Sequence, residues 1–353
     1  MNLRIDQWSA AALRRGLVAV SLVGSVLLAS CGGSVSSQEF APKRMLVFGD
    51  EASVLTGGSP APSRDAKKYA INALDTNSEL DCRLNLLWVQ WLASNPDYNF
   101  VFAQCNFNNA AVTAFNYATA GAKVADAVGQ VNAWLNAGNS FGPTDLVTVM
   151  VGQNDIIEIY EAYVAAGDPS QAAQDQAVTA AFNRGKTLAA LFTSVITNSS
   201  NSKARALYVV IPDVGKTPYG LSQADGGALL SRMTFGVGDK YEGFNLALRT
   251  NIANNGKSLG LVDGYNLFFN LTNNTENYAN NNGIFDLTGA GCLPANQPAY
   301  NPDAPNAYCS SSTLVNNANG SAYYLWADQT HFGTQAHYLL GDRARFLAEN
   351  NPF

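Results

Sequence analysis

The sequence predicts a three-layer α/β/α sandwich, in which a mostly parallel sheet of about five strands lies between two layers of helices. Short apolar runs alternate along the chain with longer segments of helical apolar spacing, the order typical of βαβ units. Several of these runs end in glycine followed by polar residues. The 353 residues are 47% apolar and 14% charged, which is enough apolar material for a sizeable core.

The expected elements follow one another from residue 44 onward. Continuous apolar runs predict buried strands at 44–50, 145–155, 204–215 and within 257–268. Apolar residues at helical spacing predict helices at 84–94, 115–138 (after an initial turn), 171–196, 235–256 and 333–351. The Asn-rich stretches 270–282 and 289–319 are expected to be surface loops.

The N-terminus has the pattern of an export signal. Two arginines precede an apolar stretch of about 14 residues, shorter than the roughly 20 that cross a membrane. Leu28-Ala29-Ser30-Cys31 resembles a bacterial lipobox. We therefore expect residues 1–30 to be a signal peptide, Cys31 to carry a lipid that anchors the chain to a membrane, and residues 31–43 to be a flexible tether.

Residues 44–353 are then expected to form one domain on the cell-envelope side of export. Gly32 follows Cys31, with no aspartate there to retain the protein at the inner membrane, so the outer membrane is favoured. A plain secretory signal with Cys31 as a spare thiol is the alternative. The net charge of −6 gives no electrostatic basis for nucleic-acid binding.

Four cysteines remain after Cys31, and an even count in an exported chain suggests two disulfides. We favour the local pairs Cys82–Cys105 and Cys292–Cys309, because each closes a polar, loop-like segment. Free buried thiols are the alternative. The chain has two histidines and no CxxC pair, so no metal site or cofactor is implied.

The two histidines limit the search for a catalytic base. His331 follows Asp328 by three residues, a spacing that lets the carboxylate orient the ring and leaves the other ring nitrogen free. A capping aspartate beside a surface histidine has the same spacing. His337 falls on a different face of the closing helix, and we expect it to be structural.

Two further residues are candidates to bind an oxyanion. Asn154 follows the apolar run that begins at residue 145, where its side-chain amide could donate, although asparagine is also an ordinary turn residue. Gly121 lies at a turn before a helix, where its N–H is free to face a ligand, although glycine can also be chosen for its φ angle.

These motifs resemble, in order, those of the SGNH or GDSL hydrolase family, and their flanks resemble its lecithinase/haemolysin and GDSL-lipase-like branch. The blocks are Gly49-Asp50, Asn116-Tyr117-Ala118 with Gly121, Gly152-Gln153-Asn154-Asp155, and Asp328-x-x-His331. The resemblance covers roughly residues 44–348. It implies a flavodoxin-like sandwich, Gly121 and Asn154 as oxyanion donors, His331 as the base and Asp328 as the residue that orients it.

The nucleophile departs from the family pattern, because Glu51 stands where the serine is expected. In one interpretation Ser53 is a displaced nucleophile, although side chains two residues apart in a helical turn point in nearly opposite directions. In another, Glu51 itself activates water or attacks the substrate. In a third, the site is inactive and binds a lipid or carbohydrate.

We therefore expect hydrolysis of an ester, with the nucleophile left open between Ser53 and Glu51. A lipid ester, a short acyl ester and an acetylated sugar are equally compatible with the sequence. The competing hypothesis is a surface lipoprotein of the same fold that binds a ligand without catalysis.

Overall fold

The computed structural model describes residues 40–57, 61–197, 204–237, 240–252, 257–292 and 309–349. The stretch Phe40–Phe353 forms one compact unit. The predicted signal peptide, Cys31 and most of the tether lie outside the described residues. None of the described helices combines the length and the apolar character that a membrane crossing requires.

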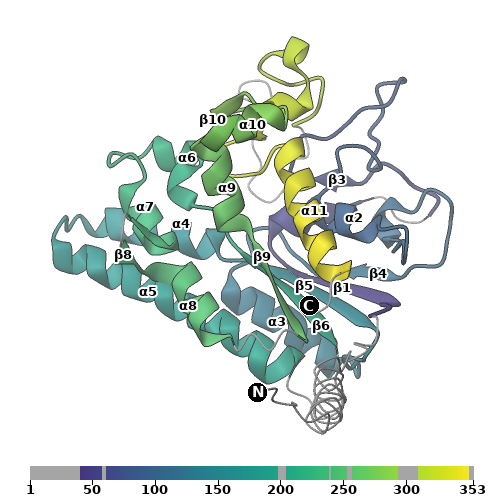
Figure 1. The fold of residues 1–353 in the computed structure, drawn as a ribbon, viewed down its shortest axis with the longest axis horizontal. Coiled ribbons are helices and arrows are strands. Elements are labelled where there is room, and N and C mark those ends of the chain that lie inside the picture. Colours follow the sequence, from purple (N-terminus) through teal and green to yellow (C-terminus); the bar gives the residue numbers. More distant parts are fainter. Residues whose placement is uncertain are drawn as a thin grey trace, which may run out of the picture. The chain divides into compact units, whose positions relative to one another are not determined.

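The centre of the unit is a parallel sheet of five strands (Figure 1), which confirms the predicted fold class. In space the strands follow the order β4-β1-β5-β6-β9. Their bounds are β1 Arg44–Gly49, β4 Ala114–Asn116, β5 Asp145–Met150, β6 Arg205–Val210 and β9 Leu259–Asp263.

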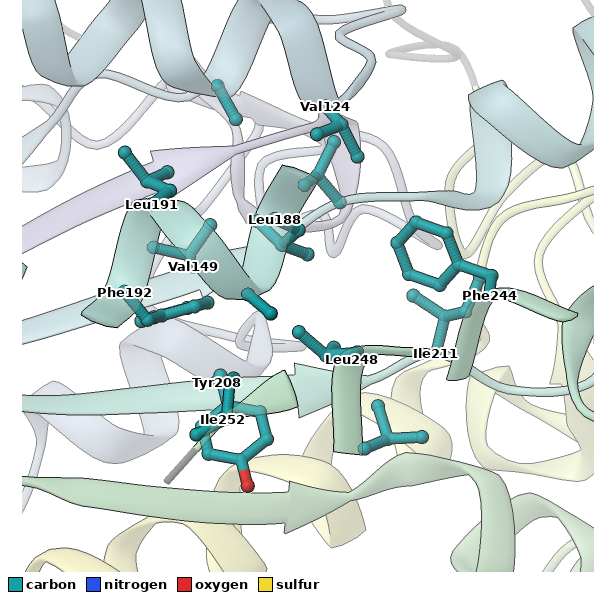
Figure 2. Close-up of a cluster of buried hydrophobic side chains, with 14 of the residues drawn as sticks. Val124, Val149, Leu188, Leu191, Phe192, Tyr208, Ile211, Phe244, Leu248 and Ile252 are labelled. Atoms are coloured by element: carbon teal, nitrogen blue, oxygen red, sulfur yellow. The ribbon is translucent and has the colours of Figure 1, made fainter. Parts of the chain in front are cut away.

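Helices cover both faces of the sheet, and alternate residues of β1 point to opposite faces, as the period of a strand requires. Met45 and Val47 pack with one group of helices, whereas Leu46 and Phe48 pack with the other. The first group is α2 Trp88–Ala93, α9 Gly264–Thr272 and α11 Thr334–Glu349. The second is α3 Val124–Asn136, α4 Gln153–Ala166, α5 Gln171–Leu191, α7 Ala228–Thr234 and α8 Gly243–Asn251. Figure 2 shows part of this second group, with Val124 of α3, Leu188 of α5 and Phe244 of α8 among the labelled side chains.

Smaller elements decorate the ends of the sheet. The strand pairs are β2 Leu55–Thr56 with β3 Lys67–Lys68, β7 Gly236–Val237 with β8 Lys240–Tyr241, and β10 Asp286–Ala290 with β11 Tyr324–Trp326. The short helices are α6 Pro218–Leu221 and α10 Tyr278–Asn281. The loop after β11 leads into α11 and carries Asp328 and His331.

Several predicted elements are corrected by the structure. The expected strand 145–155 ends at Met150, and α4 begins at Gln153. The expected helix 84–94 begins only at Trp88, because Asn85 has a φ of 45° that no α-helix accepts. The segment 235–256 forms the β7–β8 pair before α8 begins at Gly243. The Asn-rich stretch 270–282 contains the end of α9 and all of α10.

Candidate active site

The site lies where the order of the strands reverses. β4 pairs with one edge of β1 and β5 with the other, and ligands of open α/β sheets bind at such a switch point, beyond the carboxyl ends of the strands. Glu51 follows β1, Gly121 lies beyond β4, and Asn154 lies in the first turn of the helix that follows β5. The fold therefore brings three residues that are far apart in the sequence together at the carboxyl edge of the sheet.

The end of β1 explains how Glu51 is aimed. Gly49 has a φ of 127°, and a Cβ atom there would lie 1.9 Å from the carbonyl oxygen of Met150, so only glycine fits between β1 and β5. Asp50 then caps a single 3-10 turn, Glu51–Ser53, by accepting a hydrogen bond from the N–H of Ala52 at 3.1 Å. The pKa of Asp50 is raised well above its ordinary value by burial and by the neighbouring Glu51 charge.

The Glu51 carboxylate lies against Gly121 and Asn154, the two groups expected from the sequence to bind an oxyanion. Gly121 donates its backbone N–H to Oε2 at 2.8 Å. The Asn154 amide nitrogen Nδ2 lies 2.9 Å from Oε2 and 3.0 Å from Oε1. Both donors that the sequence singled out therefore meet at one point, and the group they hold is a side chain of the protein itself.

Ser53 lies away from this point, contrary to the expectation of a displaced serine nucleophile. Its side chain is fully buried, and Oγ accepts a hydrogen bond from Nε1 of Trp88 at 3.1 Å. Trp88 belongs to the core on the α2 side of the sheet. The cause is the turn itself, because side chains two residues apart in it point to different sides, so Glu51 and Ser53 cannot both face His331.

The expected pair of Asp328 and His331 is formed. Asp328 Oδ2 lies 2.7 Å from His331 Nδ1, and Asp328 Oδ1 accepts the backbone N–H groups of Thr330 and His331 at 2.9 and 3.0 Å. Burial alone would raise the pKa of Asp328, but His331 and these hydrogen bonds outweigh it and lower that pKa to about 2. His337, by contrast, is fully buried and accepts the N–H of Trp88 through Nδ1, in keeping with a structural role.

His331 also faces Glu51, with 3.8 Å between Nε2 and Oε1. Burial lowers the pKa of His331, but the carboxylates of Asp328 and Glu51 outweigh burial and raise it to about 10. Burial raises the pKa of Glu51, whereas His331 and Asn154 lower it further than burial raises it. Near neutral pH the site therefore holds a glutamate anion beside an imidazolium.

Little space remains around this ion pair. The cavity next to Glu51 and His331 has a volume of about 10 Å³ and is also lined by Tyr69, Gln153 and Phe332. A space of that size holds about one water molecule. The ring centroid of Tyr69 lies 5.2 Å from that of His331.

Several supporting residues could not be found from the sequence. Gln130 on α3 accepts the N–H of Gly49 at 2.8 Å and donates to the Gly49 carbonyl and to the Thr119 hydroxyl at 3.0 and 2.9 Å, which ties the loop before Gly121 to the end of β1. Gln153 donates to the carbonyl of Thr330 at 3.2 Å and so links α4 to the loop of His331. A glutamine within a helical pattern carries no signal of such a role.

Comparisons with known proteins agree with the fold and give the family of the chain. The model of GDSL-like lipases and acylhydrolases matches residues 70–344. The chain thus belongs to the GDSL-like lipase/acylhydrolase family, a family of esterase- and lipase-like hydrolases. The match begins after Glu51, so the segment that carries the unusual residue lies outside it. A comparison with curated proteins found no match.

Solved structures with some similarity include two lipases and an acetylxylan esterase. A lipase from a goat rumen metagenome has 11% identity and a TM-score of 0.45, with 88% of this chain and 99% of that chain covered. An acetylxylan esterase from Geobacillus stearothermophilus has 12% identity and a TM-score of 0.39, with 89% and 98% covered. An extracellular lipase from Streptomyces rimosus has 14% identity and a TM-score of 0.31, with 78% and 97% covered.

Proposed function

We propose that the chain hydrolyses small carboxylic esters with the Glu51 carboxylate as the nucleophile in place of serine. One observation carries the proposal: Glu51 lies between the two oxyanion donors and the His331–Asp328 pair. Carboxylates act as nucleophiles in other hydrolytic sites when they are ionised and held in place. Both conditions are met here, since the pKa of Glu51 is lowered and its carboxylate accepts hydrogen bonds from Gly121 and Asn154.

The proposed reaction begins with the oxygen that faces His331. Oε1 of Glu51 attacks the acyl carbon of the ester, and the alcohol leaves with the proton of His331 Nε2. This forms a mixed anhydride between the acyl group and Glu51. Water then cleaves the anhydride and releases the carboxylic acid, and His331 takes up a proton again. Because its pKa is raised to about 10, His331 carries near neutral pH the proton that it donates in the first step.

The substrate is proposed to be small because of the space around the ion pair. A cavity of about 10 Å³ leaves no buried tunnel for a long acyl chain in the resting site. The Glu51 residue is 6% exposed and the His331 side chain 16% exposed, so a substrate must approach this edge from solvent. Among the three substrate classes compatible with the sequence, short acyl esters fit this geometry best.

A second candidate function is binding without catalysis. The specific observation in its favour is that Gly121 and Asn154 already hold a carboxylate, so a substrate carbonyl has no free donor in the resting site. In that reading the family fold serves as a surface lipoprotein that binds a lipid or carbohydrate ligand.

Hydrolysis of p-nitrophenyl esters of increasing acyl length separates the candidates. We expect turnover by the parent that favours the shortest acyl groups, is lost in Glu51→Gln and is retained in Ser53→Ala. The exposed Glu158 provides a matched control, since Glu158→Gln makes the same chemical change outside the site. Inactivity of the parent at every acyl length would favour the binding protein, and loss of turnover in Ser53→Ala alone would restore serine catalysis.

We also propose that the chain works outside the cytoplasm, anchored through a lipid on Cys31, most favourably at the outer membrane. The lipobox-like tetrad ending at Cys31 supports the anchor, and two disulfides support an oxidising compartment. Fractionation of cells that produce the parent and Cys31→Ser tests it. The parent is expected in the outer membrane and the variant in the soluble fraction, whereas identical distributions would contradict the anchor.

A further inference from the structure

In this chain the oxyanion hole serves the side chain that occupies the nucleophile position. In the site of a serine hydrolase, the donors hold the oxygen of the substrate carbonyl. Here Gly121 holds Oε2 of Glu51, Asn154 contacts both carboxylate oxygens, and Oε1 also faces His331. Attack by Oε1 therefore needs no carbonyl group on the substrate. Gly121 and Asn154 stabilise an oxyanion only later, when the ester formed on Glu51 is hydrolysed.

We infer that the same site hydrolyses small epoxides to diols through a covalent ester on Glu51, an activity beyond the hydrolysis of carboxylic esters. The inference rests on the proposed role of Glu51 as a nucleophile. An epoxide requires two groups side by side, an anion that attacks carbon and an acid that protonates the ring oxygen. Glu51 Oε1 and His331 Nε2 provide this pair at a separation of 3.8 Å.

The first step opens the ring. Oε1 of Glu51 forms a bond to one epoxide carbon while the bond from that carbon to the ring oxygen breaks. The ring oxygen takes the proton from Nε2 of His331. The products are a hydroxyalkyl ester of Glu51 and a neutral imidazole, and no other reactant is consumed.

The second step hydrolyses the ester at the carbonyl carbon of Glu51. His331 takes a proton from water, and the water oxygen bonds to Cδ. The oxyanion that forms on Oε2 is held by the N–H of Gly121 and the amide of Asn154, the donors that already lie 2.8 and 2.9 Å from it. The bond from Cδ to Oε1 then breaks, and the diol, which contains Oε1, leaves with the proton held by His331. The oxygen of water takes the place of Oε1 in the Glu51 carboxyl group.

The charges return to the starting state at the end of the cycle. The carboxylic acid formed on Glu51 gives its proton to His331, which restores the anion and the imidazolium. The sum is epoxide plus water to diol. The change in His331 between the steps follows from its neighbours, because esterification removes the Glu51 charge that helps to hold the proton on the ring.

The room beside Glu51 and His331, about 10 Å³, is the size of the single water that the second step consumes and is too small for an epoxide. The epoxide must therefore reach the ion pair from the solvent side, where the His331 side chain is 16% exposed. An epoxide places the attacked carbon and the leaving oxygen in one three-membered ring, so it brings both reacting atoms to the ion pair without filling a long cleft. Propylene oxide is accordingly the probe of choice.

The test follows oxygen from water into Glu51. The purified chain is incubated with propylene oxide in oxygen-18 water over many turnovers and then digested with trypsin, which yields the peptide 45–64 that contains Glu51. We expect propane diol to form and this peptide to gain oxygen-18. Glu51→Gln should reduce diol formation on the order of a hundredfold or more, whereas Glu158→Gln should match the parent in both readouts.

A rapid acid quench of the parent during turnover traps the intermediate, and the peptide 45–64 should then carry the mass of the hydroxyalkyl ester. His331→Gln removes both the acid of the first step and the base of the second, so it should form neither this ester nor the diol. Diol formation with no label in the peptide would overturn the covalent ester. No diol at all, together with ester hydrolysis that depends on Glu51, would overturn the epoxide activity and leave the proposed function standing. Absence of both activities would overturn both.

Discussion

At the scale of single residues, Glu51 changes the chemistry that His331 can perform. A serine enzyme needs a neutral histidine to accept the nucleophile's proton, so its rate rises as that histidine deprotonates. Beside the Glu51 carboxylate, the pKa of His331 is raised to about 10, and the ring carries its proton in the resting site. The pH dependence of the reaction therefore distinguishes a glutamate nucleophile from a serine nucleophile.

We predict that kcat/KM for p-nitrophenyl acetate, corrected for uncatalysed hydrolysis, is level across neutral pH and falls as the pH rises through about 10. The level region reflects ionised Glu51 and protonated His331, which kcat/KM reports for the free enzyme. In Glu51→Ser the dependence should reverse, with a rate that rises as His331 deprotonates. A parent profile that rises through neutral pH would contradict a glutamate nucleophile.

Ser53 gives a second prediction at this scale, on stability. Its hydroxyl is the acceptor for the buried Nε1 of Trp88. We expect Ser53→Ala to lower the free energy of unfolding by about 1–3 kcal/mol, the cost of an unpaired buried donor, with kcat/KM unchanged. Denaturant unfolding measures the first quantity. A variant as stable as the parent would show that the hydrogen bond to Trp88 contributes little.

At the scale of elements, the sequence predicted best what depends on continuous hydrophobic runs. The strands β1, β5, β6 and β9 lie within predicted segments, because both faces of a central strand are buried and its residues are apolar throughout. The helix α4 is not predicted: only two residues separate its first residue, Gln153, from the end of β5, and the apolar run of the strand extends to Val151, so the sequence predicts one strand over 145–155. β4 has only three residues, and the sequence predicts a turn there.

Candidate residues were predicted more accurately than their contacts. Gly121, Asn154, Asp328 and His331 meet as expected, since each lies beyond a strand at one edge of the fold. The hydrogen bonds of Gln130 and Gln153 depend on the exact packing of α3 and α4, which no local pattern encodes. The contact of Glu51 with Gly121 and Asn154 depends on the direction of the 3-10 turn Glu51–Ser53, which the sequence does not determine.

Asp155 allows a prediction about how two helices are joined. It is fully buried near the start of α4, and its Oδ2 accepts the N–H of Val124, the first residue of α3, at 2.9 Å. Arg184 lies 3.5 Å from Oδ1. We expect Asp155→Ala to lower the free energy of unfolding by about 1–3 kcal/mol, because the first turn of α3 loses an acceptor. Asp155→Asn keeps an acceptor oxygen and should cost less.

The dependence on pH separates the hydrogen bond of Asp155 from its charge. Burial raises the pKa of Asp155 from 3.8 to about 6. Because this pKa is raised on folding, ionisation opposes the folded state, and the stability contributed by Asp155 is lost as the pH rises from about 4 to about 6. The stability of Asp155→Asn relative to the parent should therefore increase across that range. A constant difference would contradict the raised pKa.

At the scale of the whole molecule, the two disulfides confirm the pairs expected from the sequence, Cys82–Cys105 and Cys292–Cys309. They close separations of 23 and 17 residues. On the loop-entropy model each contributes about 3 kcal/mol to the free energy of unfolding. On this model alone, removing either disulfide should lower the free energy of unfolding by nearly the same amount.

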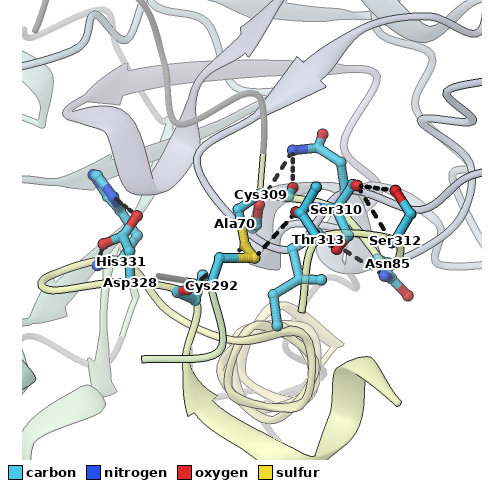
Figure 3. The surroundings of a disulfide bond; sticks show 12 residues. Ala70, Asn85, Cys292, Cys309, Ser310, Ser312, Thr313, Asp328 and His331 are labelled. Carbon is cyan, nitrogen blue, oxygen red and sulfur yellow. Dashed lines mark hydrogen bonds and ion pairs between the residues drawn. A yellow bond between two sulfur atoms is a disulfide. The ribbon is translucent and has the colours of Figure 1, made fainter. Parts of the chain in front are cut away.

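Their positions predict different effects on activity. Cys292 donates its N–H to the carbonyl of Ala327 at 2.8 Å, directly before Asp328, and the pair lies near Asp328 and His331 (Figure 3). The carbonyl of Cys82 instead accepts hydrogen bonds from Lys68 and Gln90 at 3.4 and 3.0 Å, in the core on the α2 side. The second disulfide thus supports the strand end from which the Asp328–His331 loop departs, whereas the first supports the packing of α2.

We therefore expect the double variants Cys82→Ala/Cys105→Ala and Cys292→Ala/Cys309→Ala to lose similar stability, about 3 kcal/mol each. Only the second variant should also have a lower kcat, because Asp328 no longer holds His331 in one orientation. Denaturant unfolding and ester kinetics well below the unfolding midpoint measure the two effects separately. The first pair is the matched control for a lost crosslink. Equal kcat in both variants would mean that Asp328 keeps its position through the hydrogen bonds of its own loop.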